Sequence, residues 1–231
     1  MAFDTYQEYA QAALAKHAQS DAASRYALVS EVENIEIKRV LDIGCGAGQE
    51  LLPFIERRNA FCVGIDIADS LGQVTEAVFK SKADAQRVAF SRADGASLPF
   101  ADASFDVVLC QVALPYMNNR QTIAEVARVL RPGGVFLLKI HAPAFYFGML
   151  PERIKTLNAK QIAYPLICLA GSLWHSLTGK QPEKGFWQGK EIFQTQSFLK
   201  KEFSKNDLRI ERKLADNNRQ TPSFYIVKNN R

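Results

Sequence analysis

The sequence is poor in cysteine and has no long apolar run. Its four cysteines, Cys45, Cys62, Cys110 and Cys168, lie far apart, and no CxxC pair or Cys/His cluster occurs among the 231 residues. This spacing indicates neither a zinc site nor a disulfide framework, so we expect buried thiols and no bound metal. No stretch reaches the ~20 apolar residues of a membrane-spanning helix, and the N-terminus has no basic stretch followed by an apolar one. The chain is therefore expected to be cytoplasmic.

Charge is distributed unevenly along the chain. The net charge is +5, but residues 1–150 carry 14 Lys and Arg against 17 Asp and Glu, whereas residues 151–231 carry 15 against 7. A basic C-terminal part of this kind indicates either an anionic partner or a solvated surface. No internal repeat or low-complexity tract interrupts the sequence, and 47% apolar with 23% charged residues is typical of a globular protein.

From residue 39 onward, short β-branched runs alternate with amphipathic stretches. The predicted strands are RVLDI, AFCVGI, RVAFSR, FDVVLC and VFLLKI, and the predicted helices between them are QELLPFIERR, SLGQVTEAVFKSK and NRQTIAEVARVL. This alternation favours a parallel sheet with helices on both faces. With two later strands, LRIERKL and PSFYIVKN, the expected fold is a Rossmann-like, doubly wound, mostly parallel seven-stranded sheet.

The remaining segments complete a single domain over residues 1–231. Residues 1–37 are predicted to form N-terminal helices, with Ser20 as an N-cap, and Asn119 is expected to cap the helix that follows the fourth strand. Residues 131–134, Arg-Pro-Gly-Gly, predict a tight turn between that helix and the fifth strand. Residues 142–190 are expected to be a helical insertion after the fifth strand, and residues 191–231 a helix and two strands.

The segment VLDIGCGAGQE at residues 40–50 predicts a ligand site. A strand that ends in Gly44, Gly46 and Gly48 and passes directly into a helix brings backbone N–H groups against a ligand. A dinucleotide-binding loop would have Gly or Ala at position 49, where this chain has Gln49. Asp42 inside the strand would repel a pyrophosphate and attract a cationic amine or sulfonium.

Four segments together resemble a known family. VLDIGCGAG at 40–48, GIDIADS at 64–70, RADGASLPFADASFDVVLC at 92–110 and EVARVLRPGGVFLLK at 125–139 are similar, in order and spacing, to the motifs of class I S-adenosylmethionine (SAM)-dependent methyltransferases. The greatest similarity is to the small-molecule, methyltransferase type 11-like branch that includes ubiquinone and menaquinone C-methyltransferases. The resemblance covers roughly residues 38–141, which become the expected cofactor-binding core.

The resemblance implies a methionine side of the cofactor site. Gly44, Gly46 and Gly48 would shape the loop under the methionine part of SAM. Asp42 would orient that part through water, and Cys110 would offer its backbone carbonyl to the cofactor's amino group. The same side includes Cys45 and Gln111.

The resemblance also implies an adenosine side. Asp66 would accept hydrogen bonds from both ribose hydroxyls, a role suited to a carboxylate, which only accepts when ionised. Ile67 would lie against the adenine, Asp94 would take its amino group, and the Gly95 N–H would meet a ring nitrogen. The alternatives are a helix cap or turn acid for Asp66, and the ordinary Asp-Gly turn for Asp94.

Two residues are candidates for acting on the methyl acceptor. His141 follows the fifth strand and titrates near neutral pH, and Tyr116 follows the fourth strand; capping or packing is the alternative for His141. Related quinone enzymes often carry histidine or an acid near the position of Pro115. The run from Cys110 to Ala113 lacks the Asn, Asp or Ser before Pro-Pro-Tyr of amino-methyltransferases of nucleic-acid bases, which argues against a nucleic-acid substrate.

The insertion contains the most apolar stretch of the chain, IAYPLICLAGSLWHSL. Residues 143–178 are interpreted as a lid over an apolar acceptor, as a segment in contact with a membrane interface through 159–178, or as helices buried against the core or a second subunit in a homodimer. Trp174 would mark the boundary of an interfacial helix, which Pro165 and Gly171 are expected to break.

The sequence therefore predicts a SAM-dependent methyltransferase that acts on a small, hydrophobic or amphipathic metabolite and releases S-adenosylhomocysteine. Two alternatives stay open. One is a methyltransferase that acts on protein or RNA through the basic C-terminal part. The other is a non-catalytic module that binds SAM or S-adenosylhomocysteine without methyl transfer.

Overall fold

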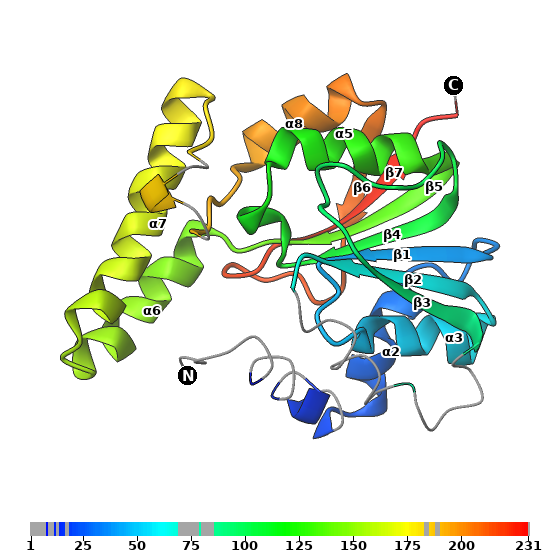
Figure 1. The fold of residues 1–231 in the computed structure, drawn as a ribbon, viewed down its shortest axis with the longest axis horizontal. Coiled ribbons are helices and arrows are strands. Elements are labelled where there is room, and N and C mark those ends of the chain that lie inside the picture. The colour runs from blue at the N-terminus through cyan, green and yellow to red at the C-terminus, as the bar shows by residue number, and fades with distance from the viewer. Residues whose placement is uncertain are drawn as a thin grey trace.

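A seven-stranded sheet forms the centre of the protein. The computed structural model describes residues 8, 12, 14–16, 19–68, 79, 86–182, 185–187 and 190–230. The strand order is β3-β2-β1-β4-β5-β7-β6; the first five strands pair in parallel, and β7 is antiparallel to both of its neighbours (Figure 1). The predicted mostly parallel sheet is confirmed. Its strands are β1 Arg39–Ile43, β2 Phe61–Asp66, β3 Val88–Arg92, β4 Phe105–Gln111, β5 Leu130–Lys139, β6 Leu208–Lys213 and β7 Ser223–Lys228.

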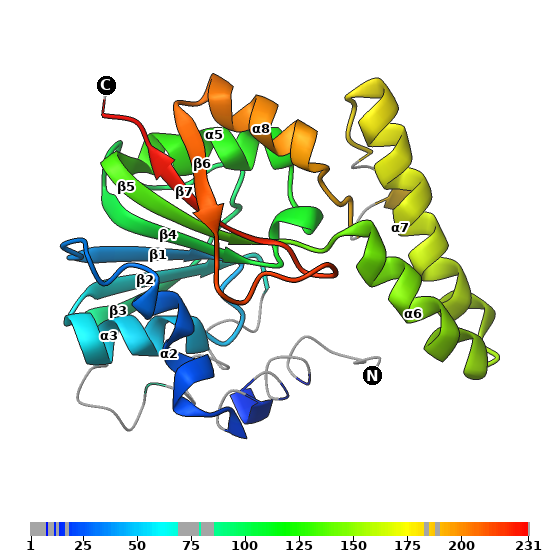
Figure 2. The same cartoon turned by 180° about the vertical axis from the view of Figure 1, so that it is seen from behind.

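Helices cover both faces of this sheet (Figures 1 and 2). Helices α2 and α3 lie on one face and α5 and α8 on the other, while α6 and α7 form an insertion beyond the end of the sheet at which the parallel strands finish. The helices are α2 Ala22–Ser30, α3 Leu52–Arg58, α5 Asn119–Val129, α6 Pro143–Lys155, α7 Ala159–Thr178 and α8 Gln196–Lys205, with short 3-10 turns η1 Gln49–Leu51, η3 Leu114–Tyr116 and η4 Gly185–Trp187.

The central strands are apolar on both sides because both faces of the sheet are covered. In β4, Val107 and Leu109 belong to the core under α2 and α3, whereas Val108 and Cys110 belong to the core under α5 and α8. All four are fully buried. Alternate residues of one strand thus serve two separate cores, as the two-residue repeat of a strand requires.

Two helix starts differ by one residue from those predicted. Asp21, not Ser20, caps α2 by accepting a 2.7 Å hydrogen bond from the Ser24 N–H. Asn118, not Asn119, caps α5 through a 3.1 Å bond from the Gln121 N–H. Adjacent Ser-Asp and Asn-Asn pairs supply two competent side chains each, and the residue with extended backbone becomes the cap.

The predicted turn at residues 131–134 is wrong. These residues lie inside β5, whose pairing with β4 shifts register between Phe105 and Val107. Gly133 adopts a φ of 71° in this irregular stretch, so the proline and glycines make a bulge within the strand. The predicted helix at residues 70–82 and most of the first predicted helix lie outside the described residues.

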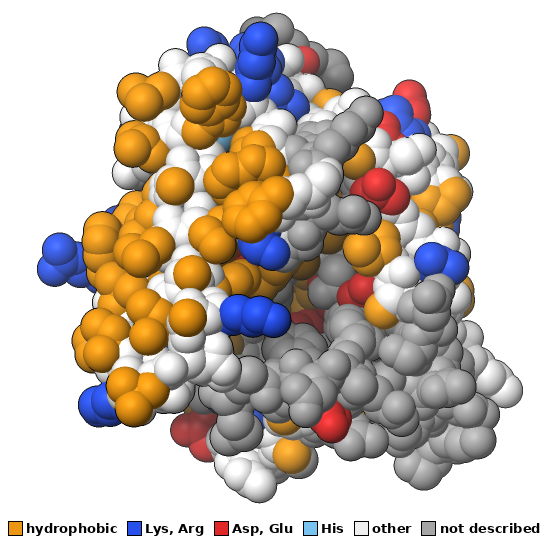
Figure 3. All heavy atoms as spheres, turned by 60° about the vertical axis from the view of Figure 1, so that its left-hand side comes forward, with side chains coloured by type: hydrophobic (Ala, Val, Ile, Leu, Met, Phe, Trp, Pro, Cys, Tyr) orange, Lys and Arg blue, Asp and Glu red, His pale blue; other side chains and the backbone are white. Residues whose placement is uncertain are grey.

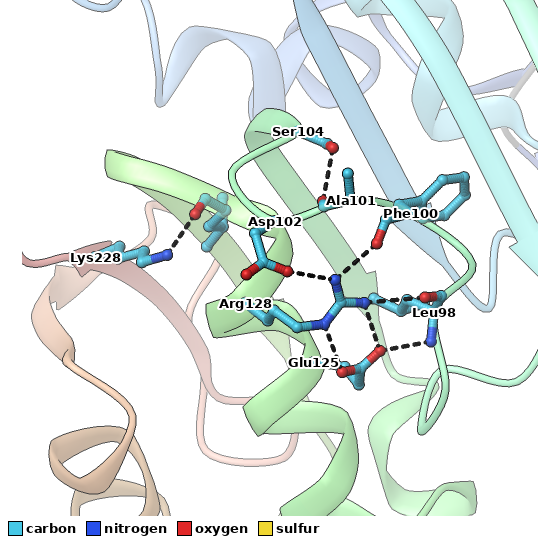
Figure 4. Close-up of polar contacts among 9 residues, drawn as sticks. Leu98, Phe100, Ala101, Asp102, Ser104, Glu125, Arg128 and Lys228 are labelled. Atoms are coloured by element: carbon cyan, nitrogen blue, oxygen red, sulfur yellow. Dashed lines mark hydrogen bonds and ion pairs between the residues drawn. The ribbon is translucent and has the colours of Figure 1, made fainter.

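Arg128 fixes the loop that leads into β4 (Figure 4). Its guanidinium donates to the carbonyls of Leu98 and Phe100 at 3.0 and 2.7 Å and pairs with Asp102 at 2.8 Å. Glu125 accepts from Arg128 Nε at 2.8 Å and, with its other oxygen, from the Leu98 N–H at 2.7 Å. The Leu98-Pro99-Phe100 run is therefore a corner that α5 holds in place.

Helix α7 runs without a break through Pro165 and Gly171, contrary to the expectation that these residues would interrupt it. A Cβ atom on Gly171 would lie 2.5 Å from the Trp187 ring and 2.9 Å from Ile192. Glycine is needed there for close approach between the helix and the following chain, not for a change of direction. The insertion has a small core of its own, made of Tyr146, Cys168 and Phe193.

Candidate functional site

The three glycines after β1 form a turn of left-handed residues. Gly44, Gly46 and Gly48 have φ values of 70°, 56° and 77°. Their surroundings differ, however, because a Cβ atom would lie 2.3 Å from the Ala113 side chain at Gly44 but would meet none of the described residues within 4 Å at Gly46. Gly44 therefore allows close packing, whereas Gly46 borders open space in which a ligand can approach the backbone.

Asp66 joins this turn to the end of β2. Its carboxylate accepts 3.1 Å hydrogen bonds from the N–H groups of Gly46 and Ala68. The neighbouring Ile67 exposes 66% of its side chain, a large value for an isoleucine beside a buried strand. A hydrogen-bonding carboxylate and an exposed apolar side chain thus stand together beside the glycine turn.

Three carboxyl groups, those of Asp42, Glu50 and Asp66, gather near the turn. Asp42 is 2% exposed, and its carboxyl group makes no hydrogen bond within the part of the chain that the structure describes. Burial, followed by the charges of Glu50 and Asp66, raises the pKa of Asp42 well above its usual value. Burial also raises the pKa of Glu50, partly offset by Lys139. A positively charged ligand at this position would stabilise the ionised form of Asp42.

Asp94 and Gly95 occupy the turn after β3. The Asp94 carboxylate accepts a 2.9 Å hydrogen bond from the Ala96 N–H, and the Asp94 carbonyl accepts a 3.0 Å bond from the Ser97 N–H. Asp94 therefore does stabilise an Asp-Gly turn, the alternative considered for it from the sequence. Gly95 is buried, and a Cβ there would lie 2.9 Å from both Ile43 and Met117. The exposed Asp94 keeps its second carboxylate oxygen for other partners.

The end of β4 contains a strained residue that the sequence did not reveal. Val112 has a φ of 55°, a conformation that β-branched residues rarely adopt, and it donates to the Lys139 carbonyl at 2.8 Å. Burial raises the pKa of the preceding Cys110 thiol to about 12, which excludes it as a nucleophile at neutral pH. Gln111 donates to the Leu137 carbonyl at 3.1 Å.

His141 and Tyr116 meet at a buried acid, Glu191. Glu191 Oε1 accepts from the hydroxyls of Tyr116 and Tyr164, both at 2.8 Å. Its Oε2 lies 2.6 Å from His141 Nδ1 and accepts from Tyr146 at 2.9 Å. The five residues come from η3, the end of β5, α6, α7 and the segment before α8. Both predicted acceptor-side residues are thus held by one carboxylate.

The surroundings of this carboxylate favour its ionised form. Burial opposes its charge, but the hydrogen bond with His141 and the hydroxyls of Tyr116 and Tyr164 outweigh that effect, and they hold the pKa of Glu191 below its usual value. Burial and the same negative charge raise the pKa of Tyr146, which therefore stays a donor. His141 stacks on Phe145, with ring centroids 3.7 Å apart. The imidazole is fixed in orientation with Nδ1 toward the acid, which leaves Nε2 for another partner.

The sequence did not identify Glu191. No motif surrounds Glu191, and the side chains that donate to it lie up to 75 residues away from it in the sequence. Gln49 was noted only for the glycine that it replaces, yet among the described residues its buried Oε1 has no hydrogen-bond partner at the start of the helix after the glycine turn. An orphaned acceptor at that position is a second sign of a missing ligand.

The two groups of residues share one end of the sheet. Asp42, Asp66, Gln111 and His141 lie in or directly after four neighbouring parallel strands near their carboxyl ends, where the chain order reverses between β1 and β4. This is the position at which doubly wound sheets bind ligands. Figure 3 shows the surface hollowed between the insertion and the core. Within the described residues, no three His, Cys, Asp or Glu side chains are arranged to hold a metal ion.

Comparison with known proteins gives this arrangement a family. The model of the family described as "Methyltransferase domain" matches residues 41–138. The chain carries a methyltransferase domain. Its resemblance to the class I SAM-dependent methyltransferases is confirmed over this segment, which includes the glycine turn, Asp66, Asp94 and the end of β4. His141 and Glu191 lie outside it.

Two relatives support the assignment of the methyltransferase domain. The uncharacterized methyltransferase YcgJ of Bacillus subtilis (strain 168) is 37% identical over 107 residues, which are 45% of this chain and 40% of the relative. The 27-O-demethylrifamycin SV methyltransferase of Amycolatopsis mediterranei (strain S699) is 40% identical over 98 residues, 42% of this chain and 36% of the relative. The matched part spans less than half the length of either relative.

A solved structure extends the likeness in fold beyond the methyltransferase domain. The [4+2]-cyclase SpnF superimposes with a TM-score of 0.61 over 88% of this chain and 79% of its own, at 16% identity. At this identity the likeness concerns the fold alone. It includes a protein named for a different reaction, so the chemistry of this chain must be argued from its own residues.

Proposed function

We propose that the protein is a SAM-dependent methyltransferase that methylates a hydroxyl group on a small, hydrophobic or amphipathic metabolite. The observation that carries the proposal is the His141–Glu191 pair at the end of β5, on the sheet edge that also bears the acid-lined glycine turn. The His141–Glu191 pair provides a base held in one orientation, and the acid-lined glycine turn favours a cationic ligand.

The cofactor fits the residues present. SAM carries a sulfonium and an ammonium group, and burial of Asp42 beside Glu50 and Asp66 disfavours three carboxylates in the absence of positive charge. The space over Gly46 admits a ligand against the backbone. When bound, SAM supplies a methyl group on a sulfonium that leaves as a neutral thioether.

The proposed adenosine side follows the family resemblance. Asp66 accepts from the ribose hydroxyls, and the exposed Ile67 covers the adenine. Asp94 and Gly95 bind the adenine edge. On the methionine side, the Cys110 carbonyl takes the ammonium group, while Cys45 and Gln111 complete the wall. Residues 38–141 are the proposed cofactor-binding core, and residues 142–190 cover the acceptor.

His141 would act as the general base. Because Nδ1 faces the ionised Glu191, Nε2 is the ring atom that takes the hydroxyl proton as the acceptor oxygen attacks the methyl group. Glu191 stabilises the resulting imidazolium. The name of the rifamycin relative supports oxygen as the attacking atom and a small molecule as acceptor. Tyr116, joined to the same carboxylate, would position that acceptor.

Cofactor binding is tested by calorimetry with S-adenosylhomocysteine. Asp66→Ala is expected to weaken binding by about 1.5 to 3 kcal/mol, the range for hydrogen bonds to a charged group. Glu211→Ala, which removes an exposed acid on β6, is the matched control and should bind normally. Equal affinity of both variants would remove Asp66 from the ribose site.

Turnover is tested by S-adenosylhomocysteine formation against hydroxylated apolar acceptors. His141→Gln is expected to abolish most turnover while cofactor affinity stays unchanged. Cofactor binding without turnover on any small acceptor would favour the non-catalytic module. Turnover only on RNA or protein, lost at high salt, would favour a macromolecular acceptor bound by the basic C-terminal part.

A further inference from the structure

The insertion exposes an extended apolar face. Figure 3 shows hydrophobic side chains gathered over α6 and α7, with basic side chains at the border. Single exposed apolar residues are ordinary on a protein surface, but a contiguous group marks an interaction site. We call this group the outer face; it consists of Phe147, Ile154, Leu157, Leu166, Leu173, Trp174, Leu177 and Phe186, all at least half exposed.

The outer face lies on the side of α7 away from the core. At about 100° per residue, Leu166, Leu173 and Leu177 fall on one stripe of the helix. The buried residues of α7, which include Cys168, Ser172 and His175, fall on the opposite stripe. The buried stripe contacts the segment beside Glu191, since the Phe193 N–H donates to Ser172 at 2.9 Å. Helix α7 therefore has an exposed apolar stripe opposite the stripe that packs against the described chain.

Basic residues border the outer face. Between residues 143 and 190 the sequence has six Lys and Arg against two acids, Glu152 and Glu183. Glu152 pairs with Lys155 at 2.6 Å. Lys190 lies 5.6 Å from the centre of the exposed Phe186 ring. This combination of apolar and aromatic side chains with a positive border complements an anionic lipid surface.

The same charges disfavour a second copy of the chain. A twofold contact through the outer face would bring two basic borders together with almost no acid between them. None of the helices in the described part of the chain is long and apolar enough to cross a membrane. We infer that the outer face binds the surface of an anionic bilayer, with α6 and α7 lying along the headgroups.

The proposal is tested by co-sedimentation of the whole protein with vesicles of phosphatidylcholine alone or mixed with phosphatidylglycerol. Binding is expected to be at least ten-fold stronger to the anionic vesicles and to weaken as salt is raised. Because each lysine near such a surface contributes about a five-fold effect, Lys160→Glu with Lys180→Glu should weaken binding by about 25-fold or more. The matched control, Lys200→Glu with Lys201→Glu on α8, should bind like the wild type.

The apolar contribution is tested separately. Leu173→Ser with Leu177→Ser should lower vesicle binding at least ten-fold, while Phe61→Ser, at an exposed position on β2, should not. In a Trp187→Phe background the remaining Trp174 emission should shift to the blue when anionic vesicles are added. Circular dichroism and melting curves confirm that each variant is folded.

Three results would overturn the inference. One is absence of sedimentation with both vesicle compositions. Another is binding that the α7 variants leave unchanged. The third is light scattering that gives a dimer for the wild type and a monomer for the Leu173→Ser, Leu177→Ser variant, which would assign the outer face to a second copy. None of these measurements depends on methyl transfer, so failure here leaves the proposed function untouched.

Discussion

Replacement of Glu191 by Gln tests the acid at the centre of the acceptor site. The change keeps the size of the side chain but replaces one carboxylate oxygen by an amide NH₂ group, which cannot accept a hydrogen bond. Each oxygen accepts from two donors, at 2.6 to 2.9 Å. In either orientation of the amide, its NH₂ group therefore faces two side chains that are themselves donors. The negative charge is lost from all four hydrogen bonds.

The magnitude follows from these contacts. Hydrogen bonds to a charged group contribute about 1.5 to 3 kcal/mol each, and two of the four are broken in a buried site, partly replaced by repositioned side chains. We expect a loss of about 3 kcal/mol in the free energy of unfolding. For a chain of this size that corresponds to a melting temperature roughly 6 to 12 °C lower. Tyr146→Phe, which removes one donor and leaves the acid, should cost about a third as much.

Calorimetry and steady-state kinetics are the assays. Without the acid His141 loses its orientation and the stabilisation of its protonated form, so kcat should fall by about 10²- to 10⁴-fold, the range of general-base contributions. Cofactor affinity should change less than two-fold. The reasoning would be refuted by a melting temperature within 2 °C of the wild type, or by a loss of cofactor binding parallel to the loss of kcat.

The pH dependence gives a further check on Glu191. Its pKa is lower in the folded protein than the usual value of 4.5, so the folded state binds fewer protons there than the unfolded chain. The stabilisation is therefore fully present above pH 4.5 and is lost as the pH falls through the folded pKa. The stability difference between wild type and Glu191→Gln should shrink at acid pH; a constant difference from pH 7 to pH 3 would mean that Glu191 is not ionised.

Four other changes probe the cofactor side and the fold. Because burial raises the pKa of Asp42, its folded form is destabilised as pH rises, so Asp42→Asn should raise the melting temperature at pH 8, lose that advantage near pH 4, and bind SAM more weakly by calorimetry. In Gly46→Ala there is room for the Cβ, so the variant should melt within a few degrees of the wild type but bind S-adenosylhomocysteine at least ten-fold more weakly. In Gly44→Ala the Cβ would clash with Ala113, so the main effect should be a lower melting temperature. Arg128→Met should lower the unfolding free energy by roughly 2 kcal/mol, because its hydrogen bonds to the loop before β4 are only partly exposed to solvent, with denaturant titration as the measurement.

Most of the central sheet could be predicted because β1, β2, β4 and β5 are buried on both faces. Such strands appear as short continuous apolar runs, and each of the five runs from residue 39 to residue 140 coincides with a strand to within a few residues. The ends of the helices were harder to predict from the sequence. In the Ser20–Asp21 and Asn118–Asn119 pairs both side chains can cap, and the choice depends on backbone angles that composition does not encode.

The acceptor side could be predicted only in part. His141 was identifiable because it directly follows a strand whose carboxyl end faces the site. Glu191 was not, because its function depends on hydroxyls from α6, α7 and η3, whose relative positions are set by tertiary packing. Val112 was hidden for a related reason: its φ of 55° is one that valine rarely adopts, and its N–H donates to the carbonyl of Lys139, which is distant in the sequence.

The position of β7 has a consequence for how the protein is made. β5 lies in the middle of the finished sheet, but its neighbour on one side is β7, which follows only after the insertion, α8 and β6. While the chain emerges from the ribosome, the edge of β5 therefore stays bare until residues 223–228 have been synthesised. A bare apolar edge readily pairs with other chains. Stalling or truncation before Ser223 should thus leave a nascent chain that aggregates even though all of its proposed cofactor-binding residues are present.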